Sequence, residues 1–409
     1  MVLVLESLLL AFIFLACHAA HVAPQALLEA SATSTPGVIS DYLALMSFKS
    51  RIMSDPSRSL AMCQWHGVVC GLSRSRRGRV VVLDLGELSL LGTITPALGN
   101  LTYMRRLNLA QNHFHGDLPQ ELGNLHDLET LQLSYNSIQG QVPPSLSNCT
   151  RLVSVSLHGG KFPNLKQFLV ADNQFRGTLP SSLCNATMLQ WIQTASNFLS
   201  GTIPRCLGAR QKNLSIVWLE ANQFEATNNV DWEVLTSLTN SSKMKVLDVG
   251  TNRLQGVLPN SIANLSTQLE YLVMSYNNIA GIITEGIGNL VNLKELIMNH
   301  NILKGVIPAS LSKLKNLNKL SLSNNALSGP IPVTFGNLTK LTILLLSTNA
   351  ITGAIPSSLS NCPLEVLDLS HNNLSGPTPK ELFSITTLSR LGFPVQRRHR
   401  WTAHRSVML

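Results

Sequence analysis

One short phrase recurs along most of this chain. In each copy an Asn follows apolar residues placed eight, five and three positions earlier, as Leu317, Leu320 and Leu322 do in the copy that ends at position 325. Thr194 is the one exception to the apolar pattern. The Asn residues, for which 24 residues is the commonest interval, are Asn112, Asn136, Asn173, Asn197, Asn222, Asn252, Asn277, Asn301, Asn325, Asn349 and Asn372. A period of this length predicts a solenoid, because each repeat can bury its apolar residues only against its neighbours.

Each repeat is expected to form one strand, and stacked repeats place these strands side by side in a parallel sheet on the concave side. The Asn stands where the chain turns out of the strand, and its amide can pair with backbone groups that would otherwise be buried without partners. The residues that follow, such as Gly305 to Pro308, combine a glycine that permits a bend with a proline that fixes an extended return. We therefore expect the convex side to be irregular rather than helical.

The repeats, about thirteen over residues 80–393, resemble the plant-specific class of leucine-rich repeat. The stretches DYLALMSFKS (41–50) and CQWHGVVC (63–70) are similar to the N-terminal cap of plant leucine-rich-repeat receptor kinases, which places a cap at 38–79. The insertion NNVDWEVLTSLTNSSKMKVLDVG (228–250) resembles the immune receptors that sense bacterial peptides. The resemblance implies an α/β-type repeat solenoid, a right-handed superhelix with a parallel concave sheet, a mostly irregular convex side and a helical N-terminal cap.

In that family the solenoid is an extracellular domain, followed by a membrane helix and a cytosolic kinase. The sequence contains none of the kinase motifs (GxGxxG on a strand, HRD, DFG), so we interpret the chain as a receptor ectodomain truncated before those parts. Residues 1–23 read as a secretory signal, because an apolar run from Leu8 to Ala16 precedes small residues. No later apolar run is long enough to cross a bilayer. We expect a secreted protein in the apoplast, and the full-length family at the plasma membrane.

The spacing of the cysteines is consistent with a secreted protein. Cys63 and Cys70 form a close pair that favours a disulfide in an oxidising compartment. Cys184 and Cys206 lie in successive repeats at positions offset by two, so a disulfide between them demands local bending, and the sequence leaves this pairing open. Cys149 and Cys362 replace a leucine of the repeat and are expected to be buried thiols.

The formal charge of +9 does not indicate nucleic-acid binding. Most of the excess lies in two arginine groups at opposite ends of the repeats, without an interleaved aromatic platform. We interpret both as solvated ends, the second within an unstructured basic tail at 394–409. The groups are Arg74, Arg76, Arg77 and Arg79, and Arg397, Arg398, Arg400 and Arg405.

The repeat is irregular between Asn136 and Asn173, which are 37 residues apart. Residues 152–160 begin a strand in phase, with Gly160 in the Asn position, and the next strand then starts early. Either the solenoid kinks there or a segment of the chain has been lost.

No grouping of residues predicts catalysis or a cofactor, so we do not expect an enzyme. His113, His115 and His126 are interpreted as solvated surface residues rather than a metal site. Eight N-x-S/T sequons predict N-glycans, five of them twelve residues after the Asn position, on the convex flank. They are Asn100, Asn148, Asn185, Asn213, Asn240, Asn264, Asn337 and Asn373.

The concave face is the candidate binding surface, because strand residues between the leucines face solvent. Large apolar side chains at such positions, where most repeats carry polar residues, are typical of binding hot spots. They are Leu169, Trp191, Ile216, Trp218, Tyr271, Val273, Tyr276 and Ile297. Charged residues expected to fix a ligand at the rim are Lys245, Asp248, Lys294 and Glu295. The alternative is that the phase shifts near residue 160, or that residues 228–245 cover Trp218.

We therefore expect extracellular recognition of a peptide or protein ligand, with a co-receptor or a full-length receptor as further partners by resemblance. Two alternatives remain open. The first is a secreted inhibitor of microbial wall-degrading enzymes, similar to the polygalacturonase inhibitors, which have about ten coils. The second is a truncated receptor remnant without a function.

Overall fold

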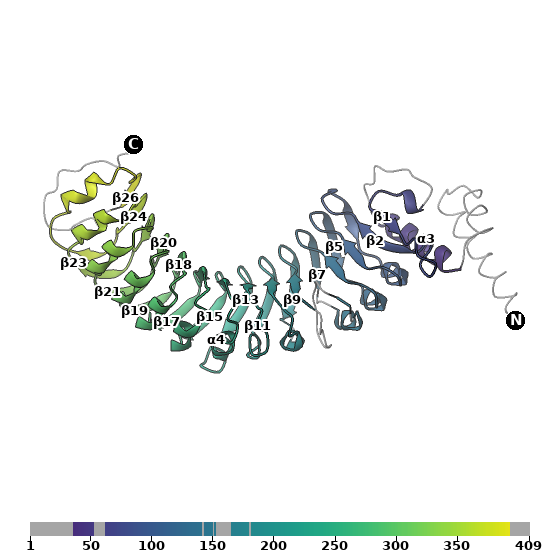
Figure 1. Cartoon of the computed structure of the whole chain (residues 1–409), viewed down its shortest axis with the longest axis horizontal. Coiled ribbons are helices and arrows are strands. Elements are labelled where there is room, and N and C mark those ends of the chain that lie inside the picture. Colours follow the sequence, from purple (N-terminus) through teal and green to yellow (C-terminus); the bar gives the residue numbers. More distant parts are fainter. Residues whose placement is uncertain are drawn as a thin grey trace.

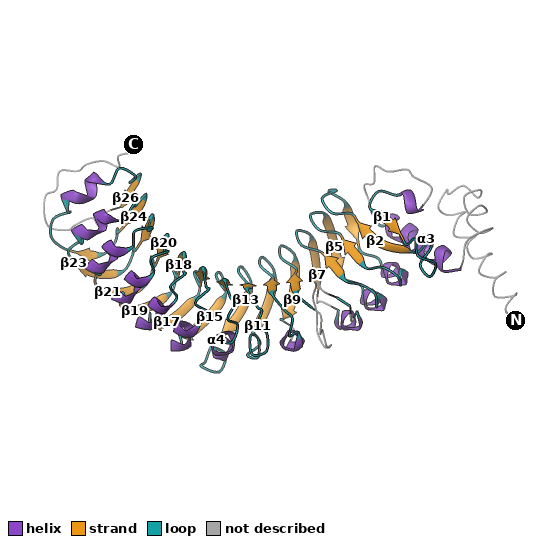
Figure 2. Cartoon of the chain, in the orientation of Figure 1, coloured by secondary structure: helices purple, strands orange, loops and turns teal. Residues whose placement is uncertain are grey.

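The computed structural model describes residues 36–52, 62–140, 143–149, 151–152, 165–179 and 181–392. The predicted signal sequence, the basic tail and the segment around Gly160 lie outside these ranges. The described residues form a curved ribbon whose inner side is lined by strands and whose outer side carries short helices (Figures 1 and 2). Parallel strands and leucine-filled coils confirm the leucine-rich-repeat solenoid that the sequence predicts.

Thirteen parallel strands of the described residues line the concave side. They divide into two sheets, because β6 does not pair with β8. The first group is β2 (Val80–Asp84), β4 (Arg106–Asn108) and β6 (Thr130–Gln132). The second is β8 (Gln167–Leu169), β10 (Trp191–Gln193), β12 (Ile216–Trp218), β14 (Val246–Asp248), β16 (Tyr271–Val273), β18 (Glu295–Ile297), β20 (Lys319–Ser321), β22 (Ile343–Leu345), β24 (Val366–Asp368) and β26 (Arg390–Gly392).

A second parallel sheet runs along the flank, where the sequence predicts only an extended return. Its twelve strands are paired without interruption. They are β3 (Leu91–Thr93), β5 (His113–Asp117), β7 (Ser137–Gly140), β9 (Gln174–Thr178), β11 (Phe198–Thr202), β13 (Gln223–Ala226), β15 (Arg253–Val257), β17 (Asn278–Ile282), β19 (Ile302–Val306), β21 (Ala326–Pro330), β23 (Ala350–Gly353) and β25 (Asn373–Leu374).

The convex side differs from the expectation of an irregular chain, because most coils carry one short 3₁₀ helix there. A single turn fits between the proline and the next strand, and its central apolar residue, such as Leu311, is fully buried. The helices are η2 (Pro96–Asn100), η3 (Gln120–Asn124), η4 (Pro144–Asn148), η5 (Ser181–Asn185), η6 (Asn260–Asn264), η7 (Glu285–Asn289), η8 (Ala309–Lys313), η9 (Val333–Asn337), η10 (Ser357–Asn361) and η11 (Lys380–Ser384).

The N-terminal cap consists of α3 (Pro36–Lys49), η1 (Met62–Gln64) and β1 (Val68–Cys70). Cys63 and Cys70 form the disulfide that their spacing predicts, with Cα atoms 5.6 Å apart. The fully buried Asp41 of α3 accepts hydrogen bonds from the Arg79 guanidinium and from the backbone N–H of Val80 at 2.8 Å. This charge pair joins the cap to the first coil, and β1 continues the concave sheet by pairing antiparallel with β2.

The Asn residues of the repeat form a continuous ladder. Asn301, for example, donates from Nδ2 to the carbonyls of Met274 (2.9 Å) and Met298 (3.2 Å), and its Oδ1 accepts from Ile279 N–H (2.9 Å). All eleven Asn residues repeat this pattern between adjacent coils. The residue before each Asn has a left-handed φ of 50–59°, so the ladder holds a turn that is unfavourable for residues with a side chain.

The ladder also explains the long interval. Asn173 Nδ2 donates to Leu133 O (3.0 Å), its Oδ1 accepts from Ile138 N–H (3.2 Å), and β7 pairs directly with β9. The coil of Asn173 therefore stacks directly on the coil of Asn136, although the two residues are 37 positions apart. The expected strand at 152–160 lies, apart from Leu152, outside the described residues.

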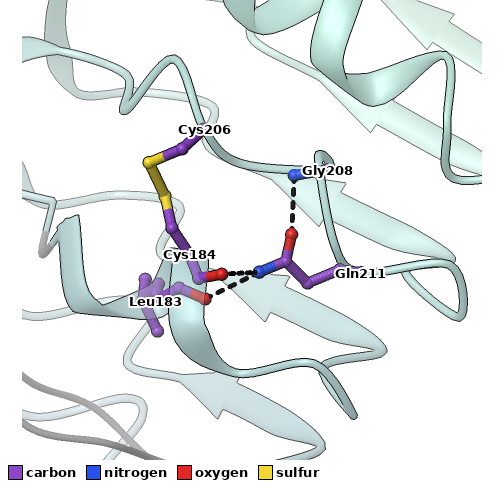
Figure 3. Close-up of a disulfide and its surroundings, with 5 residues drawn as sticks. All are labelled: Leu183, Cys184, Cys206, Gly208 and Gln211. Carbon is purple, nitrogen blue, oxygen red and sulfur yellow. Dashed lines mark hydrogen bonds between the residues drawn. A yellow bond between two sulfur atoms is a disulfide. The ribbon is translucent and has the colours of Figure 1, made fainter.

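Cys184 and Cys206 form a second disulfide, with Cα atoms 5.5 Å apart (Figure 3). The bending that their offset demands is present, because residues 205–209 form a turn in place of the usual 3₁₀ helix. Gln211 is fully buried beside the bridge. Its Nε2 donates to the carbonyls of Leu183 (3.0 Å) and Cys184 (2.8 Å), and its Oε1 accepts from Gly208 N–H (2.9 Å) (Figure 3).

Cys149 and Cys362 are buried free thiols, as the sequence predicts. Each Sγ–H donates to a backbone carbonyl, of Leu122 and of Phe335 respectively. Burial raises the pKa of Cys149 to about 12 and that of Cys362 to about 11, so both remain protonated and unreactive at neutral pH.

We expect Asn301→Ala to lower the free energy of unfolding by about 3 kcal/mol, because several buried backbone groups lose their partners together. Chemical denaturation followed by circular dichroism measures this. Asn278→Ala, at an exposed position on β17, is the control and should change stability by less than about 0.5 kcal/mol. Equal effects of the two substitutions would contradict a supporting role for the ladder.

The Cys184–Cys206 bridge closes a short loop, so replacing both residues by Ser should cost about 3 kcal/mol. Thermal unfolding of the oxidised protein measures the loss. A titration of unreacted thiols on the denatured wild-type chain provides the check, and recovery of the Cys184 and Cys206 thiols in free form would show that the bridge is not formed.

Candidate functional site

The concave strands present two solvent-facing rows of side chains. In each three-residue strand from β4 to β24 the middle residue is buried in the core, as Leu272 of β16 is, and the residues on either side point outward. The pairing register aligns them across the sheet. The first-position row is Gln167, Trp191, Ile216, Val246, Tyr271, Glu295 and Lys319, and the third-position row is Leu169, Gln193, Trp218, Asp248, Val273, Ile297 and Ser321.

Both tryptophans lie on this face rather than in the core. Trp191 and Trp218 are each 38% exposed, and they stand two positions out of register because Trp191 aligns with Ile216. Trp218 Nε1 donates to Glu220 Oε2 at 3.2 Å. The remaining apolar candidates in the two rows are half-buried, namely Leu169, Ile216, Tyr271, Val273 and Ile297. The phase of the repeat is therefore retained beyond the irregular interval.

The insertion does not cover Trp218. Its short helix α4 (Glu233–Leu238) lies on the outer side of the arc (Figure 1). Trp232, just before α4, is buried, and its Nε1 donates to Gln255 O at 2.9 Å. The insertion thus thickens the convex side and leaves the concave face open.

Tyr276 lies at the end of the concave strands, in the turn before the ladder Asn. It is 54% exposed and has φ 52°. Its ring stacks on His300 of the next coil, with ring centroids 4.2 Å apart and an interplanar angle of 12°. His300 Nε2 in turn lies 3.3 Å from Asn324 Nδ2. These three residues extend the candidate surface towards the edge of the sheet.

The predicted rim charges are only partly at the rim. Lys245 and Lys294 are exposed and flank Glu270, with Nζ to carboxylate distances of 3.8 Å and 2.6 Å. The hydrogen bond from Lys294 lowers the pKa of Glu270, and Glu270 raises the pKa of Lys294. Glu295 is half-buried in the first-position row, aligned between Tyr271 and Lys319.

Asp248 is not a rim residue, contrary to the sequence prediction. It is only 8% exposed, because it stands in the middle of the sheet between Trp218 and Val273 on the adjacent strands. Its Oδ1 accepts from Gly250 N–H at 2.9 Å. Burial, together with the nearby charge of Glu220, raises the pKa of Asp248 to about 7.

Two residues of this surface escaped the sequence analysis. Glu220 and His300 occupy the last two positions before the ladder Asn, which the alternation rule already assigns to the solvent-facing side. Neither is a large apolar residue, and neither is among the four charged residues predicted at the rim. The useful signal would have been a polar residue next to an aromatic one, two positions along the chain for Glu220 and on the next coil for His300.

The described part of the chain contains no group of three His, Cys, Asp or Glu side chains that could hold a metal ion. Among the three histidines considered as metal ligands, His113 and His115 are exposed on β5, and His126 Nδ1 lies 3.2 Å from Asn148 O.

Five of the eight sequon asparagines are the last residues of convex 3₁₀ helices and are exposed: Asn100, Asn148, Asn185, Asn264 and Asn337. Asn240 and Asn373 are also exposed, whereas Asn213 is half-buried. None of the eight lies on a concave strand of the described residues.

Comparison with known proteins agrees with this architecture. Family models described as leucine rich repeat match residues 267–327, 291–351, 103–125, 127–149 and 363–385. Receptor kinase-like protein Xa21 of Oryza sativa subsp. japonica is 46% identical over 85 residues, or 21% of this chain and 8% of that protein. A leucine-rich repeat receptor-like serine/threonine-protein kinase of Arabidopsis thaliana is 34% identical over 292 residues, or 61% of this chain and 30% of that protein.

Solved structures give the same result. The Arabidopsis receptor kinase HAESA ectodomain, in complex with an IDA peptide hormone ligand, has a TM-score of 0.69 and 30% identity, covering 88% of this chain and 62% of that one. PEPR1 with AtPEP1 has the same score and identity, covering 86% of this chain and 51% of that one.

The fold and these matches define a leucine-rich-repeat protein. Its relatives are plant leucine-rich-repeat receptor kinases, and its structural neighbours are plant receptor ectodomains, which are extracellular parts. The chain spans less than a third of the two kinases and at most 62% of the two ectodomains. None of the helices within the described residues has the length and hydropathy that crossing a bilayer requires.

The raised pKa of Asp248 predicts a pH-dependent stability. Because the folded chain holds this proton up to about pH 7, the free energy of unfolding should fall, by up to about 4 kcal/mol, as pH rises from the ordinary Asp pKa of about 4 through about 7. Asp248→Asn should remove that part of the slope in denaturation series at several pH values.

Asp368→Asn is the matched control for this prediction. Burial raises the pKa of Asp368, but the hydrogen bonds of Ser370 and Ser347 and the charge of Arg390 together outweigh it, so the pKa is lowered. The contribution of Asp368 to stability is therefore lost only in more acid solution. Between about pH 5 and pH 8, the free energy of unfolding of Asp368→Asn should change with pH as that of the wild type does. Identical slopes for wild type and Asp248→Asn would contradict the buried, protonated state.

Proposed function

We propose that this chain is an extracellular recognition domain that binds a peptide or protein ligand along its concave face, without catalysing a reaction. The observation that carries the proposal is the exposure of two tryptophans on a rigid sheet, surrounded by half-buried apolar residues. Exposed aromatic residues in such a setting provide most of the affinity of typical interfaces. The ladder and the two rows keep them in fixed positions, which lowers the entropy lost on binding.

The comparisons support the class of ligand. HAESA was solved with a peptide hormone ligand, and also with that ligand and the co-receptor SERK1. By analogy, the partners proposed for this chain are a peptide ligand and a co-receptor or full-length receptor, met in the apoplast. Glycans on the predicted sequons would project from the convex side and leave the concave face accessible.

The surface charge suggests where an acidic group of the ligand would bind. Lys245 and Lys294 occupy one edge of the concave sheet, and the aromatic residues lie further in. A ligand carboxylate at this edge would compete with Glu270 for the two lysines. The interior of the surface would then contact apolar side chains of the ligand.

The test uses short peptides of random sequence displayed on phage and selected on the purified chain. Trp191→Ala and Trp218→Ala should each weaken binding of the selected peptides by about 30-fold, because a hot-spot residue contributes about 2 kcal/mol. Fluorescence anisotropy with labelled synthetic peptides measures the dissociation constants.

Phe198→Ala is the matched control. This ring is 42% exposed and belongs to the same coil as Trp191, but it lies on the flanking sheet in β11. Its loss should leave affinity unchanged. If both tryptophan substitutions also leave affinity unchanged, the concave face is not the binding surface.

A further inference from the structure

Three neighbouring strands of the flanking sheet, β15, β17 and β19 (Figure 1), carry large apolar side chains on their outward side. Each of these side chains is between 49% and 57% exposed: Val257, Ile282, Ile302 and Val306. The pairing register aligns Val257 with Ala280 and Ala280 with Ile302, so the apolar residues are neighbours across the strands. Exposed apolar side chains that are grouped in this way are typical of an interaction site.

The residue that follows the glycine near the end of a flanking strand sets these coils apart. Elsewhere in the repeats this residue is polar, small or a proline, as Thr178 and Thr202 are on earlier strands. In three successive coils it is a branched aliphatic residue, namely Val257, Ile282 and Val306. The repeat does not require this, because the core of each coil is filled by other residues. The apolar surface is therefore a property of these coils and not of the fold in general.

The glycine of the following coil supports these side chains. A Cβ atom on Gly305 would lie only 3.0 Å from Ile282 Cγ2, and one on Gly329 only 2.8 Å from Val306 Cγ1. Each branched side chain therefore rests on the backbone of the next coil and exposes its other side to solvent. Because Val and Ile have few rotamers, a partner that covers them loses little conformational entropy.

Lys304 lies in the middle of this apolar surface. It stands between Ile302 and Val306 along β19 and is aligned with Ile282 of β17. Its ammonium group is exposed and has no salt bridge or hydrogen bond to any described residue. The outward positions of β15, β17, β19 and β21 contain no Asp or Glu that could pair with it. We call the following residues the flank patch: Val257, Ile282, Ile302, Lys304 and Val306.

The predicted glycans leave the flank patch uncovered. None of the eight sequons falls between Asn264 and Asn337, and β17 and β19 lie within that interval. A glycan of the extracellular protein would therefore not shield these two strands along their own coils. The patch is accessible to a large partner.

We propose that the flank patch is the docking surface for a second protein that presents an Asp or Glu side chain surrounded by apolar residues. The carboxylate would accept a hydrogen bond from the ammonium group of Lys304, and the apolar residues of the partner would cover those of the patch. The patch belongs to a different sheet from Trp191 and Trp218. The inference therefore goes beyond the proposed function and does not depend on it.

The charge of the flank patch argues against a second copy of this chain as the partner. A two-fold symmetric dimer places the same surface on both sides of its interface. The unpaired Lys304 of one copy would then lie close to that of the other, and like charges across an interface oppose association. A different protein with a carboxylate at the centre of its contact surface has the complementary charge.

The experiment uses random peptides displayed on phage and selected on the full chain that carries Trp191→Ala and Trp218→Ala, so that the concave face does not dominate the selection. Selected peptides should share an Asp or Glu flanked by apolar residues. Lys304→Glu and Ile282→Ser, each added to that chain, should weaken binding of the synthetic peptides by at least about tenfold, measured by fluorescence anisotropy. Replacing the acidic residue of the peptide by its amide should have a similar effect.

Two matched substitutions control for the change of charge and the loss of an apolar side chain. Lys313→Glu makes the same charge change at the exposed end of η8, in the same coil as Lys304. Val291→Ser removes an apolar side chain that is 47% exposed just after η7. Both should leave affinity unchanged, and circular dichroism should show an intact fold for all four variants.

The proposal is overturned if no peptide is enriched, or if Lys304→Glu and Ile282→Ser fold and bind the selected peptides as the parent chain does. Sedimentation velocity should show a monomer, and a dimer that Ile282→Ser dissociates would identify a second copy as the occupant instead. Binding to phosphatidylserine vesicles that Lys304→Glu abolishes would identify a membrane surface instead. The concave face is tested with its own peptides and tryptophan substitutions, so either proposal can fail while the other stands.

Discussion

The hydrogen bonds of the Asn ladder support every turn between a concave strand and the flank of this solenoid. Each side-chain amide bonds backbone groups of its own coil and of the preceding coil, and it stabilises a turn whose previous residue has a left-handed φ. Without it, every coil would bury unpaired carbonyl groups. The ladder also fixes the spacing of coils, so it sets the register of both sheets, including the step from Asn136 to Asn173 where the concave sheet is interrupted.

Rigidity of this kind decides where function can lie. The leucines are occupied inside the coils and the 3₁₀ helices carry most of the sequons, so the concave rows are free to vary without disturbing the fold. In this chain the rows carry the exposed Trp191 and Trp218, and the buried Asp248 lies beside Trp218 on the next strand. Exposed aromatic area supplies affinity at such a surface.

The irregular region shows how local departures are stabilised. Next to the long interval, the Cys184–Cys206 bridge and the buried Gln211 hold two coils together where a turn replaces a 3₁₀ helix. One coil further on, the insertion packs Trp232 into the convex side. Both devices lie behind the strands that carry the tryptophans, so they maintain the face that we propose for binding.

The repeat pattern predicts the solenoid, its concave strands, the positions of the ladder and the outward direction of both tryptophans, because a strict repeat leaves one way to bury its leucines. It also predicts that Cys149 and Cys362 are buried. The pattern does not show that Cys184 and Cys206 pair, that a second sheet runs along the flank, or that Asp248 is buried rather than at the rim. These features depend on which groups of neighbouring coils meet, and a repeat pattern specifies the period of the coils but not the contacts between them.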